Sequence, residues 1–177
     1  MKKIWMLCIV MLLFSSERIY ASTPSFEQPY YEAGYKSLKQ SLTECEQHFQ
    51  REIKLPKVEP AVEFTHRFGR CNYVKDAQLE INNHYEVEYL NQNKPENHLM
   101  IWVYPLNNEL KRFPRARDTI QTYTLNNGNE ARFGTTPVKK LFNVLSFEKN
   151  DWYYIISSDR RSEIITGDVL VQLANSI

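Results

Sequence analysis

The chain has 177 residues, of which 42% are hydrophobic and 24% charged, close to the averages of a single globular domain. Its 5 glycines and 8 prolines are too few for a fibrous or low-complexity protein. The 22 basic and 21 acidic residues nearly cancel. This balance argues against a dedicated nucleic-acid-binding protein, because such proteins usually carry a basic excess.

The first 21 residues have the layout of a secretory signal peptide. A basic start at Lys2 and Lys3 precedes an unbroken apolar run of 11 residues at 4–14, and a polar stretch then ends at Ala21. The alternative is an uncleaved membrane anchor, but 11 helical residues at ~1.5 Å each cross only about half of a ~30 Å hydrocarbon core. Cys8 lies inside the apolar run, which is not the position of a lipid-modified cysteine. We therefore expect a secreted, extracellular protein that can associate with the cell envelope, without a transmembrane segment after cleavage.

A helix is predicted after an unpatterned, flexible leader at residues 22–30. Apolar side chains recur every three or four residues along one stripe, which is typical of a helix that packs on another surface: Tyr31, Tyr35, Leu38, Leu42, Cys45 and Phe49. Pro56 and Pro60 then indicate a linker of extended chain.

Beyond Pro60 the apolar period falls to two, which predicts strands. Thr166 is suited to cap a last helix, whose inward side chains include Leu170 and Leu173. We expect one α+β domain at residues 31–177, a curved antiparallel sheet of about seven strands with the N-terminal helix and a short C-terminal helix packed on it. The expected strands are 62–73, interrupted at Gly69, then 79–89, 98–104, 119–125, 130–134, 141–147 and 152–157.

Several short segments carry a family resemblance: residues 54–56 (KLP), 64–70 (FTHRFGR), 125–129 (LNNGN), 143–147 (NVLSF), 151–154 (DWYY) and 171–177 (VQLANSI). With them, most of residues 45–177 resembles a family of uncharacterised exported domains of Bacillus and related Gram-positive bacteria. Some members of that family form the outer end of anti-sigma-type membrane proteins or lipoproteins. The resemblance implies an α+β fold and an extracellular localisation, and it supplies no active site. The chain departs from the anchored members because it has no lipid-attachment motif.

Two cysteines, Cys45 and Cys71, remain after removal of the signal peptide. An even number of cysteines outside the cell permits one disulfide between them. Two alternatives are free buried thiols, with Cys45 in the apolar stripe, and a zinc site completed by His48 and His66.

A basic run at residues 111–117 has four cations in seven residues: Lys111, Arg112, Arg115 and Arg117. Outside a Gram-positive cell, the polyanions within reach are wall polymers and anionic lipid headgroups, and arginine can bind two phosphate oxygens at once. The run is therefore a candidate anion-binding site, with a solvated loop as the alternative. Arg160 and Arg161 form a similar but weaker pair.

No nucleophile, metalloprotease, phosphate-loop or C-x-x-C motif is present in the sequence, and no catalytic residue, metal or cofactor is assigned. Glu86 and Glu88 share a strand face about 7 Å apart. They form either a carboxylate pair or, more simply, an exposed polar face.

The sequence favours a secreted, non-catalytic binding or interaction domain at the cell envelope. The expected partner is an unidentified envelope component or a small apolar ligand held between helix and sheet, not a nucleic acid, and the protein is expected to be monomeric. The alternative function is a hydrolase of wall material with a dispersed carboxylate site.

Overall fold

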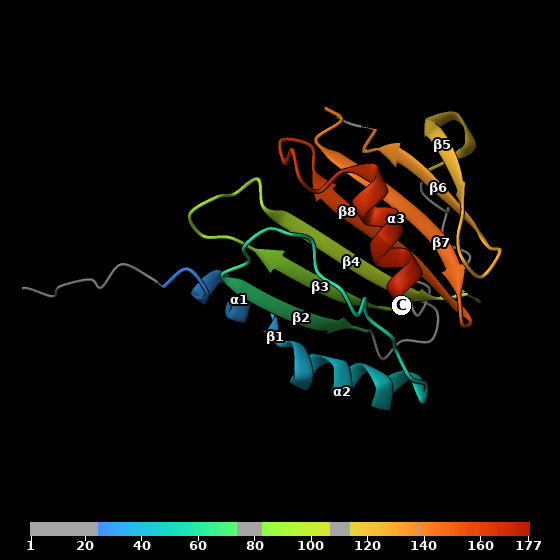
Figure 1. Cartoon of the computed structure of the whole chain (residues 1–177). Coiled ribbons are helices and arrows are strands. Elements are labelled where there is room, and N and C mark those ends of the chain that lie inside the picture. The colour runs from blue at the N-terminus through green and yellow to red at the C-terminus, as the bar shows by residue number, and fades with distance from the viewer. Residues whose placement is uncertain (1–24, 74–82, 107–113, 138) are drawn as a thin grey trace, which may run out of the picture.

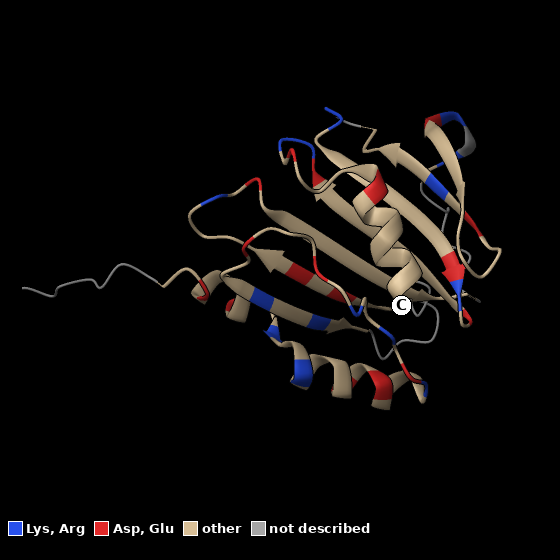
Figure 2. Cartoon of the chain, viewed as in Figure 1, with Lys and Arg blue, Asp and Glu red and all other residues tan. Residues whose placement is uncertain are grey.

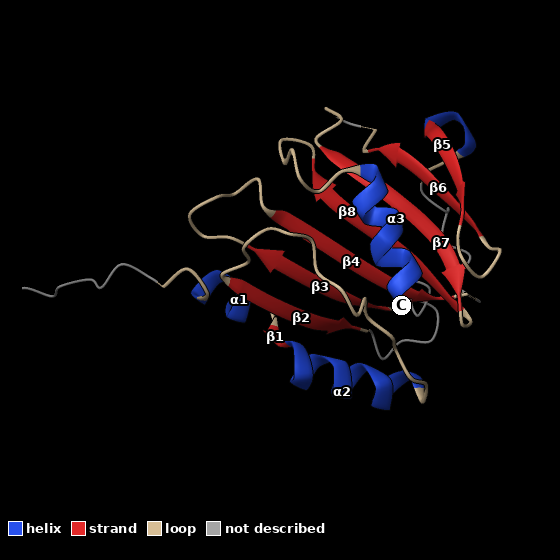
Figure 3. Ribbon diagram, in the orientation of Figure 1, coloured by secondary structure: helices blue, strands red, loops and turns tan. Residues whose placement is uncertain are grey.

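The computed structural model describes residues 25–73, 83–106, 114–137 and 139–177. The protein is an α+β domain in which one antiparallel sheet carries helices (Figures 1 and 3). The described strands follow the spatial order β1-β2-β3-β4-β8-β7-β6-β5. The expected signal peptide, the strand residues Leu79 and Ile81, and the cations Lys111 and Arg112 lie outside the described residues.

Eight strands are described, one more than the periodicity indicates, because β1 is too short to show a period. The hairpins β3–β4 and β7–β8 pair as the alternation predicts. Asn150 and Asp151, with φ of 52° and 62°, make the tight turn between β7 and β8. The strands are β1 Lys36–Ser37, β2 His66–Asn72, β3 His84–Leu90, β4 His98–Pro105, β5 Thr119–Thr124, β6 Glu130–Thr135, β7 Phe142–Lys149 and β8 Trp152–Asp159.

The N-terminal helix is interrupted, so the expectation of one continuous stripe from Tyr31 to Phe49 is wrong. The structure has α1 at Gln28–Glu32 and α2 at Leu38–Phe49, with β1 between them. Gly34 adopts a φ of 88°, a left-handed conformation that ends the first helix and that glycine takes without steric cost. Ser37 then caps α2 by accepting a hydrogen bond from the Gln40 backbone N–H at 3.4 Å.

Residues 25–30 are not a loose leader, contrary to the expectation for 22–30. The ring of Tyr30 stacks on Phe68 of β2, with centroids 4.7 Å apart, and Phe26 packs against the same small cluster. Tyr35 and Leu90 complete the cluster. The segment therefore belongs to the folded domain, on the opposite sheet face from α2 and α3.

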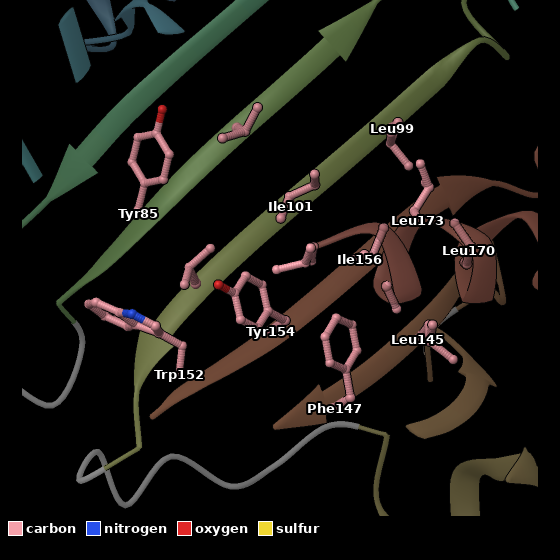
Figure 4. Close-up of a cluster of buried hydrophobic side chains, with 14 of the residues drawn as sticks. Tyr85, Leu99, Ile101, Leu145, Phe147, Trp152, Tyr154, Ile156, Leu170 and Leu173 are labelled. Carbon is pink, nitrogen blue, oxygen red and sulfur yellow. The ribbon is translucent and has the colours of Figure 1, made fainter. Parts of the chain in front are cut away.

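Helices α2 and α3 (Gly167–Ser176) cover one face of the sheet through the main core. Figure 4 shows Leu170 and Leu173 of α3 meeting Leu145 and Ile156 of the strands, and all four side chains are almost completely buried. Side chains thus fill the space between α3 and the sheet, where we expected room for a small apolar ligand. The short helix begins after Thr166, as predicted, but the Thr166 side chain makes no capping hydrogen bond.

Candidate functional site

Two groups of charged side chains stand out, and they differ in what neutralises them. The first lies on β3, on the sheet face away from α2 and α3. Glu86 and Glu88 are only 7% and 8% exposed, so the expectation of a solvated strand face is wrong for this pair. Figure 2 shows red segments on the ribbon of β3, inside the sheet. A buried charge is strongly unfavourable unless it is paired, so their partners decide their role.

Glu86 is held by side chains from both neighbouring strands. Arg70, directly opposite on β2, donates from Nη2 to its Oε2 at 2.6 Å. Trp102, directly opposite on β4, donates from Nε1 to its Oε1 at 3.2 Å. The ring of His84 lies 3.9 Å from Oε2. Both carboxylate oxygens therefore have a donor from the chain itself.

Glu88 is paired in the same way, with His98 of β4 on Oε2 and the Tyr35 hydroxyl donating to Oε1 at 3.5 Å. Burial, together with the nearby charges of Glu86 and Glu88, raises the pKa of Tyr35, which stays a neutral donor. The Arg70 guanidinium also lies over the Tyr35 ring, 4.6 Å from its centroid.

We call these six residues the β3 charge network: Tyr35, Arg70, Glu86, Glu88, His98 and Trp102. It joins the segment after α1 to the middle of the sheet. A carboxylate that serves as nucleophile or general base must be able to reach substrate. All four carboxylate oxygens of this network are instead engaged by protein donors, so the network stabilises the fold and offers little support to the hydrolase alternative.

Of the alternatives for the cysteines, the structure has the disulfide between Cys45 and Cys71. It connects α2 to β2 beside Arg70. Because both sulfurs are bonded to each other, neither is a zinc ligand with His48 and His66. Among the described residues, no group of three or more His, Cys, Asp or Glu is placed to hold a metal ion.

The second group gathers where β5 and β7 begin and β6 and β8 end. Antiparallel pairing places these points along one edge: Thr119 is opposite Gly134, and Phe142 is opposite Asp159. Figure 2 shows blue on the loops at this end. We call it the cationic end, with the members Arg115, Arg117, Lys139, Lys140, Arg160 and Arg161. All six residues are exposed.

The carboxylates at this end are fewer than the cations. Segments 114–119, 135–142 and 159–167 supply six cations and the carboxylates Asp118, Asp159 and Glu163, as far as they are described. Glu96 in the loop before β4 is a fourth carboxylate near this end, because its charge acts on Arg161. Asp159 accepts from Arg161 Nη2 at 2.6 Å, and this bond lowers the pKa of Asp159 below its ordinary value. Arg117 Nε is 3.8 Å from Asp118, a loose contact of a side chain that is 74% exposed. Charge is therefore left over for a partner.

A cavity of about 230 Å³ opens between β5 and the β6–β7 loop at the cationic end. Arg117 and Lys140 line it from two separate segments, beside three threonines that supply hydroxyls: Thr119, Thr135 and Thr136. Asp118 and Ile120 also line it. Two cations and several hydroxyls can hold an anion such as a phosphate group.

The structure thus places Arg115 and Arg117 of the basic run at the same end of the sheet as Arg160 and Arg161. It adds Lys139 and Lys140 between them, which sequence reasoning missed. A signal was available in the sequence. Lys139 and Lys140 precede the β7–β8 hairpin, and Arg160 and Arg161 follow it. The outer ends of a hairpin are neighbours, and here Arg160 Nη1 donates to the Lys140 carbonyl at 3.1 Å.

Comparison of the chain with models of protein families, with curated proteins and with solved structures finds no match. The resemblance to the exported Bacillus domains stays a prediction. Within the described parts of the chain, no helix has the length and apolar character needed to cross a membrane.

Proposed function

We propose that the protein is an exported, non-catalytic binding domain of the cell envelope, and that its cationic end binds an anionic envelope component. The observation that carries the proposal is the convergence of six exposed cations from three described chain segments on one end of the sheet, against four carboxylates there. A single basic run is commonly a solvated loop. Convergence through the fold gives a continuous surface that one polyanion can contact.

The attraction at this end must be local. After removal of residues 1–21 the chain carries 19 basic and 20 acidic residues, a net charge of −1. The rest of the surface therefore repels a polyanion weakly, and the cationic end sets the orientation of binding. Among the described residues of the cationic end, Asp159 is the one buried carboxylate, and Arg161 already pairs with it.

Retention on purified cell walls and on anionic vesicles tests the proposal. The mature protein should bind at about 0.1 M salt and be released toward about 1 M, because the Debye length falls from ~10 Å to ~3 Å. A variant with Arg115, Arg117 and Lys140 changed to Gln should lose most of this salt-sensitive binding.

The matched control changes Lys39, Lys54 and Lys57 to Gln. It removes the same charge from exposed positions outside the cationic end and should bind like the wild type. Equal loss of binding in both variants would mean that only the net charge matters and would contradict a site at the cationic end. Absence of binding by the wild-type protein at low salt would reject the proposed function.

Export has its own test. N-terminal sequencing of the protein recovered from culture supernatant should begin at Ser22 or within a few residues of it. Recovery only with membranes and with Met1 intact would contradict processing.

A further inference from the structure

Exposed aliphatic side chains accompany the charges of the cationic end. Among the described residues, six large hydrophobic side chains are exposed, and three of them lie here: Ile120 at 65%, Leu141 at 54% and Ile164 at 50%. Ile120 lines the cavity together with Arg117 and Lys140. Leu141 follows Lys140 in the chain, and Ile164 lies in the loop between β8 and α3.

Local hydrogen bonds fix the loops that carry Ile164 and Leu141. Ile165, next to Ile164, is completely buried, and its backbone is fixed at both ends: the N–H donates to Ser162 Oγ at 3.2 Å, and the carbonyl accepts from Ser158 Oγ at 3.0 Å. Ile164 is therefore presented to solvent by an anchored loop. The Leu141 carbonyl accepts the Arg160 N–H at 3.0 Å, so the two loops support each other.

Cations and exposed aliphatic side chains bind different kinds of surface. A soluble polyanion binds the cations alone. The surface of an anionic bilayer binds both, because its headgroups attract lysine and arginine while the boundary with the acyl chains accepts apolar side chains. Burial of aliphatic surface is favourable in proportion to the area removed from water. The mixture at this end fits a lipid surface better than a wall polymer.

We infer that the cationic end is a peripheral membrane-docking surface, whose partner is an anionic lipid bilayer into which Ile120, Leu141 and Ile164 insert. The inference rests on the proposed function and names its partner. It makes the protein bind beside a membrane through the start of β5, the loop before β7 and the loop after β8, without a spanning helix from the described chain.

Flotation with vesicles tests the inference. Vesicles of equal parts phosphatidylglycerol and phosphatidylcholine should carry the mature wild-type protein upward at about 0.1 M salt. Vesicles of phosphatidylcholine alone should bind far less, because they offer no net negative charge. A variant with Ile120, Leu141 and Ile164 changed to Ser should bind the anionic vesicles about tenfold more weakly. Its remaining binding should be purely electrostatic and should disappear at high salt.

The matched control changes the other three exposed hydrophobic residues, Tyr31, Val58 and Tyr73, to Ser. It should bind the vesicles like the wild type. Circular dichroism and thermal unfolding establish that each variant is folded. Unchanged vesicle binding by the folded aliphatic variant would overturn the inference.

Binding assays on the wild-type protein alone distinguish failure of the membrane-docking inference from failure of the proposed function. Retention on purified cell walls but not on anionic vesicles would overturn membrane docking and leave the proposed function standing. Binding to neither surface at low salt would reject both.

Discussion

The β3 charge network and the cationic end contain the same kinds of side chain and use them in opposite ways. In the network, Glu86 and Glu88 are buried, and each carboxylate oxygen meets a donor within the protein. At the cationic end, as far as the structure describes it, six exposed cations outnumber four carboxylates. A charge paired inside the protein stabilises the fold, whereas a charge left exposed and in excess is available to a partner.

The contrast follows from position in the sheet. Strand β3 lies between β2 and β4, so neighbouring strands supply partners at fixed register positions on both sides. The loops at the cationic end meet only along an edge, where one side faces solvent. Changes in the network should therefore lower stability, and changes at the cationic end should lower binding.

The largest loss of stability is expected from removing the disulfide beside the network. Replacement of Cys45 and Cys71 by Ala should lower the free energy of unfolding by about 3.5 kcal/mol, the chain-entropy estimate for a separation of 26 residues. Urea denaturation measures the loss, and vesicle binding by the folded fraction should stay unchanged. A double variant as stable as the wild type would show that packing alone holds α2 on β2.

The next largest loss is expected from breaking the network itself. The change Glu86→Ala removes the acceptor of Trp102 and the carboxylate partner of Arg70, which keeps its hydrogen bond to the Ala33 carbonyl. It should lower the free energy of unfolding by about 3 kcal/mol, at the low end for a buried pair because Arg70 is partly exposed. Glu163→Ala, which removes an exposed carboxylate, should stay within about 0.5 kcal/mol in the same denaturation assay. Equal effects of the two changes would remove the distinction between the regions.

A smaller effect is expected from the pairing of Asp159 with Arg161. The hydrogen bond from Arg161, with a further contribution from the charge of His98, lowers the pKa of Asp159 in the folded state. A lowered pKa adds stability above the ordinary value of 3.8, and this contribution is lost as the pH falls through the folded-state pKa.

Because Arg161 is 70% exposed, the contribution should not exceed about 1 kcal/mol. Denaturation at neutral pH and below the ordinary aspartate pKa should show a smaller acid loss for Asp159→Asn than for the wild type. An equal loss in both proteins would place the acid sensitivity elsewhere.

The sequence predicted the elements whose pattern is local. Alternation of Tyr85, Val87 and Tyr89 with polar residues indicates β3, and the residues around Asn150 and Asp151 indicate the tight hairpin. The break at Gly34 was missed because apolar spacing continues across it, from Tyr31 through Tyr35 to Leu38. A stripe of side chains carries no information on φ, so the same spacing fits one helix or two elements.

Burial of Glu86 and Glu88 could not be read from their own strand, because E-V-E alternation is also the pattern of a solvated face. The deciding residues are Arg70 and His98, which reach the carboxylates only through the pairing of β2, β3 and β4. The cationic end was likewise only partly predictable from the sequence. Arg115 and Arg117 are visible as a run, but their neighbourhood with Lys140 depends on the order of β5 to β8.

One pair of measurements on a single variant tests the division between paired and available charge most directly. The protein with Arg115, Arg117 and Lys140 changed to Gln is assayed in parallel for urea denaturation and for flotation with anionic vesicles. The account predicts a free energy of unfolding within about 0.5 kcal/mol of the wild type and loss of most salt-sensitive binding. A clear loss of stability with vesicle binding retained would contradict it, because these cations would then serve the fold and not a partner.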